Sequence, residues 1–562
     1  MTACTTLTQR EAGIVAAVFN RLFPPDDLDP GAVEIGAVTY LDRALGGWLR
    51  DEASPFRANL LRLDDAVRGS RGTPFADLEP GAQDDTLVSL ERGELPGFEG
   101  ADGIDFFRIL LARCQEGLFA DPIYGGNREE SGWRAMRHPG ITLANSAEDN
   151  LATTSVDFGG QIRSLEDVVD ELRAQTHPDL DLPNFNPRAG LEPPTGPVDV
   201  VLVGVGAVGG LIAPILTKAG LKVVGLEAGP YRSFSEFIPD ELGATYYCRQ
   251  NLGPKFMREE VRWRTDEGEP TQDPTYSLGR MMNNAGGSVI HYGAWLRRFH
   301  PHHFRLRSHI VERWGEEAIP EGCTVADWPM SYDDLEPYFT KLDWEIGIAG
   351  DDRNPYLRRS KGYPLPPTRP FRLGERFAET TREMGLHPHA VPVGYNTAPY
   401  NGFPEATYTA WDNGFGSWTG AKWHPGLTAI PAALATGDFT LRTECRVTRI
   451  LTNADGRATG VEYVDASGRM HQQMADTVVL CSYTWENLRL LFLSADGKHP
   501  DGLGNSTGQL GKHLMIKMFA HVGGFFPDET FNRHTGPAAQ GVVLDDFLHE
   551  GFDSWTAGEF LG

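Results

Sequence analysis

Apolar residues at helical spacing run through the first 120 positions of the chain. The successive stripes are Ile14, Val18 and Leu22; Val33, Ala37, Leu41, Leu45 and Trp48; and Phe56, Leu60, Leu63 and Val67. Thr8 and Glu11 have the spacing of a capping box, and Pro24 follows the first stripe, so the first helix should lie between them. The stretch 104–119 is apolar nearly all round, which predicts a helix buried on every side. The pattern predicts an all-α region, and nothing in it indicates catalysis.

A proline-rich stretch follows these helices. Residues 183–197, PNFNPRAGLEPPTGP, contain five prolines and few large apolar side chains, and residues 164–174 before them have the pattern of one short helix. We therefore expect a helical domain over residues 1–150, a linker over 151–197 and a second domain over 198–562.

The second domain opens with a nucleotide-binding pattern. Residues 199–203, DVVLV, predict a buried strand, and a GxGxxG motif at Gly204, Gly206 and Gly209 follows directly. A helical pattern comes next, then a second strand over 221–226 that ends in Glu227, 23 residues after Gly204. Glycines of this kind let a pyrophosphate approach the backbone at a helix N-terminus, and the acid accepts ribose hydroxyls. The fingerprint alone does not distinguish FAD from NAD.

Charge and hydropathy narrow the function further. The chain of 562 residues has 51 basic and 77 acidic side chains, a formal charge of −26, which disfavours nucleic-acid binding. It contains no uncharged apolar run of about 18 residues and begins with no secretion signal. From this we expect a cytoplasmic protein without a membrane span.

Neither the cysteines nor the histidines form a metal pattern. The six cysteines lie far apart with no CxxC, which excludes an attached c-type haem and disfavours a cysteine zinc site. His300, His302 and His303 are close in one loop but have no evident further ligand, so no metal site is expected. The absence of GxSxG disfavours a serine hydrolase.

The N-terminal region resembles a known subunit. Residues 106–133, FFRILLARCQEGLFADPIYGGNREESGW, look like the small (gamma) subunit of gluconate 2-dehydrogenases, and the likeness covers about residues 5–145. That subunit is a helical partner of a flavoprotein. The resemblance implies a docking or stabilising role for this domain and no chemistry of its own.

From residue 198 to about 560 the chain resembles the glucose–methanol–choline (GMC) oxidoreductases. The likeness is carried by EAGP from Glu227, by NAGGS from Asn284 and by DWPMSYDDLEPY from Asp327. Residues 440–450, 453–456, 460–464 and 475–480 resemble the family's hairpin and returning strand. The expected fold is α/β (α+β): a Rossmann-like FAD-binding GMC fold with a substrate-binding sheet, preceded by the all-α domain.

The fingerprint and the resemblance together predict the cofactor-binding residues. They are Gly204, Gly206, Gly209, Glu227, Ala228, Asn284, Gly286, Gly287, Ser288, His291 and Val447. By resemblance, the backbone of Val447 meets the adenine, and His291 matches the histidine that carries the flavin covalently in pyranose oxidases. The neighbours Ile290 and Tyr292 differ from the usual residues there, so a covalent bond through His291 stays open. Related sugar-acid dehydrogenases have cysteines before a GAK motif; this chain has GAK at 420–422 but no cysteine between Cys323 and Cys445, and no iron–sulfur cluster is expected.

The resemblance implies oxidation of a secondary hydroxyl of a sugar, sugar acid or glycoside, with hydride transfer to flavin N5 and a separate electron acceptor. The family's catalytic base lies in a C-terminal part; here Lys517 stands in place of its "MDH" histidine, and Phe560-Leu561-Gly562 resembles the start of its "FIGG" segment. We therefore expect the base in a C-terminal segment absent from this chain, with His534 and His549 too early to match it. The chain is then a fragment, or a second polypeptide completes the site. The alternatives are a non-catalytic FAD-binding or scaffold subunit and, less favoured, an NAD-dependent dehydrogenase.

Overall fold

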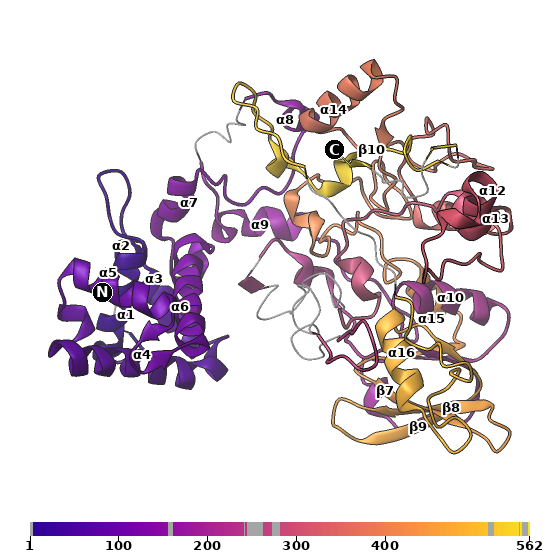
Figure 1. Cartoon of the computed structure of the whole chain (residues 1–562), viewed down its shortest axis with the longest axis horizontal. Coiled ribbons are helices and arrows are strands. Elements are labelled where there is room, and N and C mark those ends of the chain that lie inside the picture. Colours follow the sequence, from indigo (N-terminus) through magenta and orange to yellow (C-terminus); the bar gives the residue numbers. More distant parts are fainter. Residues whose placement is uncertain are drawn as a thin grey trace. The chain divides into compact units, whose positions relative to one another are not determined.

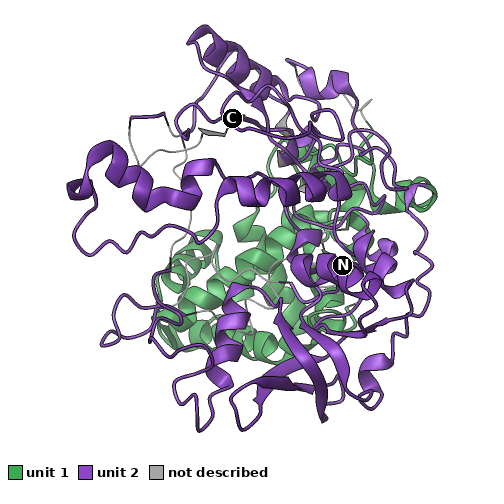
Figure 2. Ribbon diagram, turned by 90° about the vertical axis from the view of Figure 1, so that its right-hand side faces the viewer, with its two compact units in different colours: residues 1–143, 157–174, 239–248 green, residues 144–156, 175–238, 249–562 purple. Residues whose placement is uncertain are grey.

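The chain folds into two compact units. The computed structural model, drawn in Figure 1, describes residues 4–154, 161–240, 242–243, 262–272, 282–514, 522–549, 551–553 and 560–561. One unit comprises residues 1–143, 157–174 and 239–248, and the other comprises 144–156, 175–238 and 249–562, as Figure 2 shows in green and purple. Each unit is described by itself.

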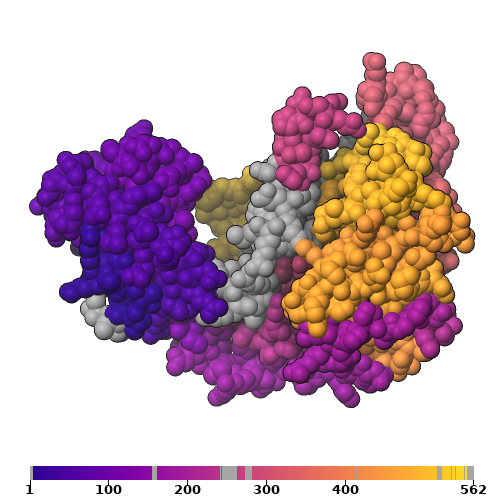
Figure 3. All heavy atoms as spheres, turned by 90° about the horizontal axis from the view of Figure 1, so that it is seen from below, coloured from indigo at the N-terminus to yellow at the C-terminus, as the bar shows by residue number. Residues whose placement is uncertain are grey.

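The first unit is helical. Its helices are α1 (Gln9–Leu22), α2 (Ala32–Ile35), α3 (Ala37–Gly46), α4 (Arg50–Arg71), α5 (Pro80–Glu91), α6 (Ala101–Phe119), α7 (Ser131–Met136) and α9 (Leu165–Gln175), with a short hairpin of β1 (Glu94–Leu95) and β2 (Phe98–Glu99). One hydrophobic core, with Phe19, Leu41, Leu60 and Leu110 among its buried members, joins the helices up to α6. In Figure 3 the first hundred residues accordingly form one continuous indigo-to-violet body.

Local signals account well for most of these helices. Thr8 and Glu11 form the predicted capping box of α1, which ends at Leu22 before Pro24. The stripe from Val33 to Trp48 is divided into α2 and α3, because Gly36 has a φ of 99° and ends one helix where the next begins.

The prediction that residues 104–119 are buried all round is wrong. Leu110 in α6 is 0% exposed, but its neighbour Ile109 is 38% exposed. The helix packs against α1, α2, α3 and α5, and Ile109 lies outside these interfaces. Scattered exposed apolar side chains of this kind are ordinary on protein surfaces.

The second unit is built on a six-stranded sheet of order β6-β4-β3-β9-β8-β7. Its strands are β3 (Val198–Val203), β4 (Val223–Leu226), β6 (Phe439–Arg442), β7 (Arg446–Thr452), β8 (Ala458–Val464) and β9 (Met470–Leu480). The first four strands of that order are parallel, and β7, β8 and β9 form an antiparallel meander. The long strand β9 belongs to both parts, since Ala475–Leu480 pairs with β3 and Met470–Met474 pairs with β8.

Helices bury both faces of the parallel part. Val200 and Leu202 of β3 pack in a core with Ile430 of α15 (Ala429–Leu434), and α10 (Ala207–Lys218) contributes to the same core. Val201 and Val203 point to the opposite core, which includes Leu490 of α16 (Thr484–Leu493). Residues 199–203 therefore form the predicted strand, with alternate side chains in two different cores.

Residues 440–450, which resemble part of the family's hairpin, form two strands. β6 ends at Arg442 and pairs with β4, whereas β7 begins at Arg446 and pairs with β8. Glu444, with a φ of 56°, lies at the bend between them. Because of this break, residues 439–442 belong to the parallel part of the sheet and residues 446–452 belong to the meander.

The rest of this unit carries α8 (Ala147–Leu151), α12 (Leu306–Trp314), α13 (Tyr332–Ile346), α14 (Arg372–Glu383) and a small sheet of β11 (Phe560–Leu561), β10 (Val542–Leu544) and β5 (His389–Ala390). The proline-rich stretch 183–197 packs on the sheet, where the Arg442 guanidinium donates to the carbonyl oxygens of Ala189, Glu192 and Pro193 at 2.7–3.0 Å. Within the described residues, no helix is long and apolar enough to cross a bilayer.

Candidate cofactor site

The GxGxxG motif forms the turn between β3 and α10. Gly204 has a φ of 91°, a conformation that favours glycine, and a Cβ on Gly209 would lie 2.1 Å from the Gly204 carbonyl oxygen. The first turn of α10 therefore packs directly on the end of β3, as the fingerprint requires. The amide groups of this helix N-terminus are suited to receive an anion.

Glu227 is fixed beside this turn. It follows β4, is 6% exposed, and its carboxylate accepts hydrogen bonds from the main-chain N–H groups of Val205 and Gly229, each at 2.9 Å. These bonds hold the acid at the carboxyl end of the parallel strands, where ligands bind in open α/β sheets.

The second glycine segment meets the first in space. The N–H of Gly286 donates to the Val205 carbonyl at 2.8 Å, and a Cβ on Gly287 would lie 2.8 Å from Cα of Gly206. A Cβ on Gly229 would lie 1.9 Å from the carbonyl carbon of Asn283. Three segments that are distant in sequence, 204–209, 227–230 and 284–288, thus share one cradle of closely approaching backbone.

The remaining predicted residues lie around this cradle. Ala228 stands between Glu227 and Gly229 and is half-buried. The Ser288 hydroxyl accepts from the N–H of Met282 at 3.0 Å. Val447 lies on β7, and its side chain packs in the same core as Val203. Its predicted backbone contact with an adenine stays a prediction.

His291 and Asn284 supply buried polar atoms without protein partners. His291 is 3% exposed, and neither ring nitrogen makes a hydrogen bond of normal geometry; Oδ1 of Asn284 is also buried and unpaired. Burial is the largest cause that lowers the pKa of His291 well below its ordinary value, and the charges of Lys422 and Arg232 add to it, so the imidazole is neutral. Buried polar atoms are normally hydrogen-bonded, so a pair of unsatisfied side chains beside a glycine cradle fits a polar ligand.

Lys422, which the sequence marked only as part of GAK, is a buried cation next to this site. It is 2% exposed, and its Nζ donates to the carbonyl oxygens of Tyr292 at 3.1 Å, Asp412 at 2.7 Å and Phe415 at 2.5 Å. Burial lowers the pKa of Lys422 to about 8, and the negative charge of Asp412 opposes that shift.

Sequence reasoning missed His424. Its Nδ1 accepts from the N–H of Gly426 at 3.2 Å, and a Cβ on Gly286 would lie 3.1 Å from the same atom. Burial and the nearby Lys422 charge lower the pKa of His424 to about 3. No periodicity identifies such a residue, but its place two residues after GAK could have suggested it.

The histidine loop at 300–303 lies elsewhere. The Nε2 atom of His300 pairs with Asp545 at 3.1 Å, and no cluster able to hold a metal ion occurs in the part of the chain that the structure describes. His549 stacks on the ring of Tyr356, with centroids 4.4 Å apart. Lys517 and Gly562 lie outside the described residues.

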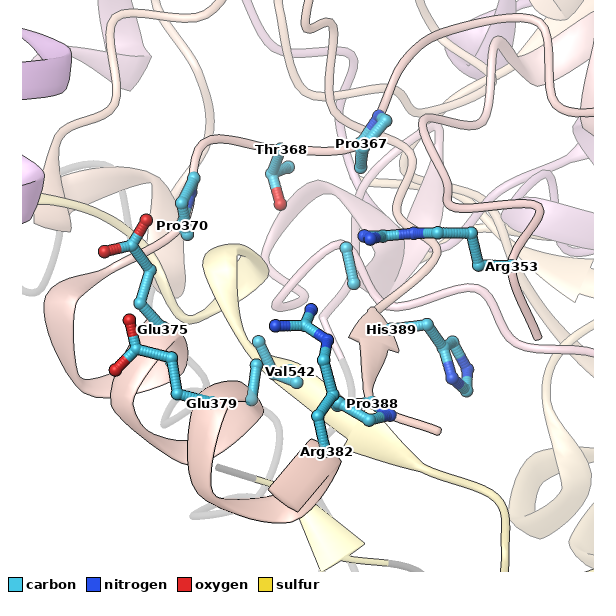
Figure 4. A pocket seen from close by; sticks show the side chains of 13 residues that line it. Arg353, Pro367, Thr368, Pro370, Glu375, Glu379, Arg382, Pro388, His389 and Val542 are labelled. Carbon is cyan, nitrogen blue, oxygen red and sulfur yellow. The ribbon is translucent and has the colours of Figure 1, made fainter. Parts of the chain in front are cut away.

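A separate cavity of about 290 Å³ opens between α14 and β10, and its lining is shown in Figure 4. The Arg353 guanidinium there already binds the Asp351 carboxylate through both Nε and Nη2. Glu375 and Glu379 line the same cavity as Arg382, so it offers no net cationic site. None of the predicted cofactor residues lines it.

Comparison with known proteins identifies two family segments. Residues 9–140 match the family gluconate 2-dehydrogenase subunit 3, and residues 286–519 match the family GMC oxidoreductase. The gluconate 2-dehydrogenase flavoprotein of Pantoea cypripedii is 31% identical over 394 residues, which are 65% of this chain and 63% of the relative. The 2-methyl-1,2-propanediol dehydrogenase of Mycolicibacterium austroafricanum is 35% identical over 62% of this chain and 60% of the relative. The chain thus spans about three-fifths of the length of these curated relatives. Among solved structures, pyridoxine 4-oxidase from Mesorbium loti is 19% identical with a TM-score of 0.33, over 53% of this chain and 52% of that one.

Proposed function

We propose that this chain, which joins a gluconate 2-dehydrogenase subunit 3 segment to a GMC oxidoreductase segment, is an FAD-dependent oxidoreductase acting on a secondary hydroxyl of a sugar, sugar acid or glycoside. The observation that carries the proposal is the convergence of residues 204–209, 227–230 and 284–288 on one cradle at the carboxyl end of a parallel sheet. The names of the relatives support the class of substrate, since they include gluconate 2-dehydrogenase, fructose dehydrogenase and paromamine 6'-oxidase.

Different residues are proposed to bind different parts of FAD. The turn at Gly204–Gly209 and the N-terminus of α10 would receive the pyrophosphate, and the Glu227 carboxylate would accept from the ribose hydroxyls. The buried atoms of Asn284 and His291 would face the isoalloxazine ring. FAD, when bound, supplies the acceptor for the hydride that leaves the carbinol carbon. The chain's own contribution at this site is to orient the cofactor and to keep water out of the buried cradle.

His291 is the proposed neighbour of the flavin ring and the candidate for a covalent bond to it. Its imidazole is buried, neutral and unpaired, which leaves a ring nitrogen with a free electron pair. Acid precipitation decides whether the bond forms. Flavin in the pellet, with a mass-shifted peptide that contains His291, establishes it; flavin in the supernatant with an unmodified peptide excludes it.

The proposed electron acceptor is a separate carrier and not molecular oxygen. The proposed partner is a second polypeptide that completes the active site. The subunit 3 segment at 9–140 and the relatives named as a flavoprotein and a large subunit support both proposals. Turnover with an artificial dye should therefore be faster than peroxide release in air. Rapid peroxide release that exceeds any dye-linked rate would contradict the dehydrogenase assignment.

An anaerobic titration tests the function as a whole. The purified chain is reconstituted with FAD and mixed with a panel of sugars, sugar acids and glycosides, and the flavin absorption bands are followed. Bleaching by members of this panel supports the proposal. Flavin that dithionite bleaches but no member of the panel reduces favours the alternative, a non-catalytic FAD-binding subunit completed by a second chain. A chain that holds no flavin contradicts both.

A further inference from the structure

We infer that Lys422 is a positioning residue for the cofactor site, whose ammonium group ties the segment 411–416 to the backbone next to His291. The inference rests on the proposed FAD function. It assigns to this site a residue that lies outside the three cradle segments 204–209, 227–230 and 284–288.

The ammonium of Lys422 is fully used. Its three N–H bonds have three acceptors, and all of them are main-chain carbonyl oxygens: those of Asp412 and Phe415 in one segment and that of Tyr292 in another. Burying a charge is unfavourable unless it is hydrogen-bonded, and these three bonds compensate the buried ammonium. They link two irregular segments of backbone, which an apolar side chain of similar length cannot do.

The segment 411–416 is held mainly by side chains. The Trp411 ring stacks on Phe415 with centroids 3.9 Å apart, and its Nε1 donates to the carbonyls of Phe237 and Gly416. The Tyr395 hydroxyl donates to the Asp412 carboxylate at 2.8 Å. The only regular element here is a short 3-10 turn, Ala410–Asn413, with no strand partner among the described residues. Lys422 joins this segment to the Tyr292 backbone, and the Gly414 backbone of the same segment acts directly on His291.

The charges around His291 agree with this role. The groups that act on it are Lys422, His424 and Arg232, all of which lower its pKa, whereas the Gly414 backbone raises it; Asp412 is the acidic group that acts on Lys422. Because His424 is itself neutral, Lys422 and Arg232 are the cations that disfavour a charged His291. Burial is the largest cause of the low pKa of His291, and the Lys422 charge adds to it.

The chain offers a matched control for this test. Arg442 is also 2% exposed and also donates to three main-chain carbonyls, those of Ala189, Glu192 and Pro193. Lys422→Met and Arg442→Met therefore each remove a buried cation that links irregular backbone in the same unit. The Lys422 side chain binds the segment next to His291, whereas the Arg442 side chain binds residues 189–193. The Arg442 carbonyl accepts from the N–H of Glu227, and the methionine variant keeps that main-chain bond.

The experiment compares wild type, Lys422→Met, Lys422→Arg and Arg442→Met as full chains reconstituted with FAD. The readouts are FAD retained after gel filtration, hydrogen–deuterium exchange of the peptide covering 411–416, and the melting temperature. We expect Lys422→Met to retain at least tenfold less FAD and to exchange faster over 411–416. Arg442→Met should lower the melting temperature but keep its FAD, and Lys422→Arg, which keeps the cation and its donors, should recover part of the retention.

Three outcomes would overturn the inference. They are wild-type FAD retention in Lys422→Met, an equal loss of FAD in Arg442→Met, and a Lys422→Arg chain as deficient as Lys422→Met. If Lys422→Met yields no folded protein, Lys422→Gln is measured in its place, since its amide keeps two N–H donors without the charge, and the same criteria apply. A wild-type chain that holds no FAD contradicts the proposed function itself, and this inference fails with it.

Discussion

Two buried carboxylates of the helical unit and two buried side chains at the cradle of the second unit differ in how they are hydrogen-bonded. In the helical unit the buried carboxylates of Asp42 and Asp64 are saturated: Asp42 accepts from the N–H groups of Thr5, Thr6 and Leu7, and Asp64 accepts from two arginines and the N–H of Phe75. In the second unit, Asn284 Oδ1 is buried without a partner, and both ring nitrogens of His291 are buried and make no hydrogen bond of normal geometry. Saturated groups fix a fold, whereas unsatisfied ones beside a backbone cradle indicate a place for a ligand.

The same contrast applies to glycine. Gly13 in α1 has no atom within 4 Å of where a Cβ would be, whereas Gly209 in α10 would place a Cβ 2.1 Å from a carbonyl oxygen. Both glycines lie in helices, yet only the second is required by a close approach of backbone. The close approach of backbone at the cradle of the second unit thus depends on the absence of side chains.

The largest expected effect is that of Gly209→Ala. The added Cβ overlaps the Gly204 carbonyl, so α10 must move away from β3, at a cost of about 3 kcal/mol or more in the stability of this unit. FAD retention should fall below detection. Hydrogen–deuterium exchange should rise in peptides from β3 and α10 and stay unchanged in peptides from α1 and α4. A variant that keeps FAD would show that the turn does not bind the pyrophosphate.

The stability of the helical unit should depend on pH through Asp121. Its pKa is raised, whereas the pKa values of the buried acids Asp42 and Asp64 are lowered. Burial raises the pKa of Asp121 to about 6. The N–H groups of Leu165 and Ile123 donate to its carboxylate and oppose this shift. Between pH 4 and 6 the folded state therefore binds more protons than the unfolded state. The contribution of Asp121 to the free energy of unfolding is therefore fully present below pH 4 and is lost as the pH rises to 6. For a pKa shift of about two units, the loss is at most about 3 kcal/mol.

The measurement is the difference in unfolding free energy between wild type and Asp121→Asn at several pH values. The amide side chain of this variant cannot titrate, so the stability of wild type relative to the variant should fall from pH 4 to pH 6 and be constant above pH 7. A difference that is independent of pH would show that the folded state leaves this carboxyl with its ordinary pKa.

Glu227→Ala should weaken FAD binding by about 1.5–3 kcal/mol, because it removes a charged acceptor for the ribose hydroxyls. That corresponds to a dissociation constant about 10–150 times higher, which titration of the apo-chain with FAD measures. Glu227→Gln keeps the shape and one acceptor oxygen, so its loss should be smaller. Equal affinity in wild type and Glu227→Ala would contradict the placing of the ribose on this acid.

The sequence predicts the parts of this molecule that depend on local patterns. The capping box at Thr8, the strand 199–203 and the glycine turn that follows it are each determined by neighbours a few residues away. The exposure of Ile109 and the break at Glu444 depend on what packs against each segment, which a single sequence does not show. Lys422 and His424 were missed as site residues for the same reason, since more than 120 residues separate them from Tyr292 and His291.

The smallest expected effect is a gain in stability from Gly13→Ala. Gly13 lies inside α1, and the space around its missing side chain is open, so alanine adds no clash. Alanine also loses less backbone entropy than glycine when a helix forms, which should stabilise the helical unit by about 0.5–1 kcal/mol. Slower hydrogen–deuterium exchange in peptides from α1, with unchanged FAD retention, is the expected result. Faster exchange would mean that α1 needs the glycine for an approach of backbone, as α10 does, and the contrast between the two helices would not hold.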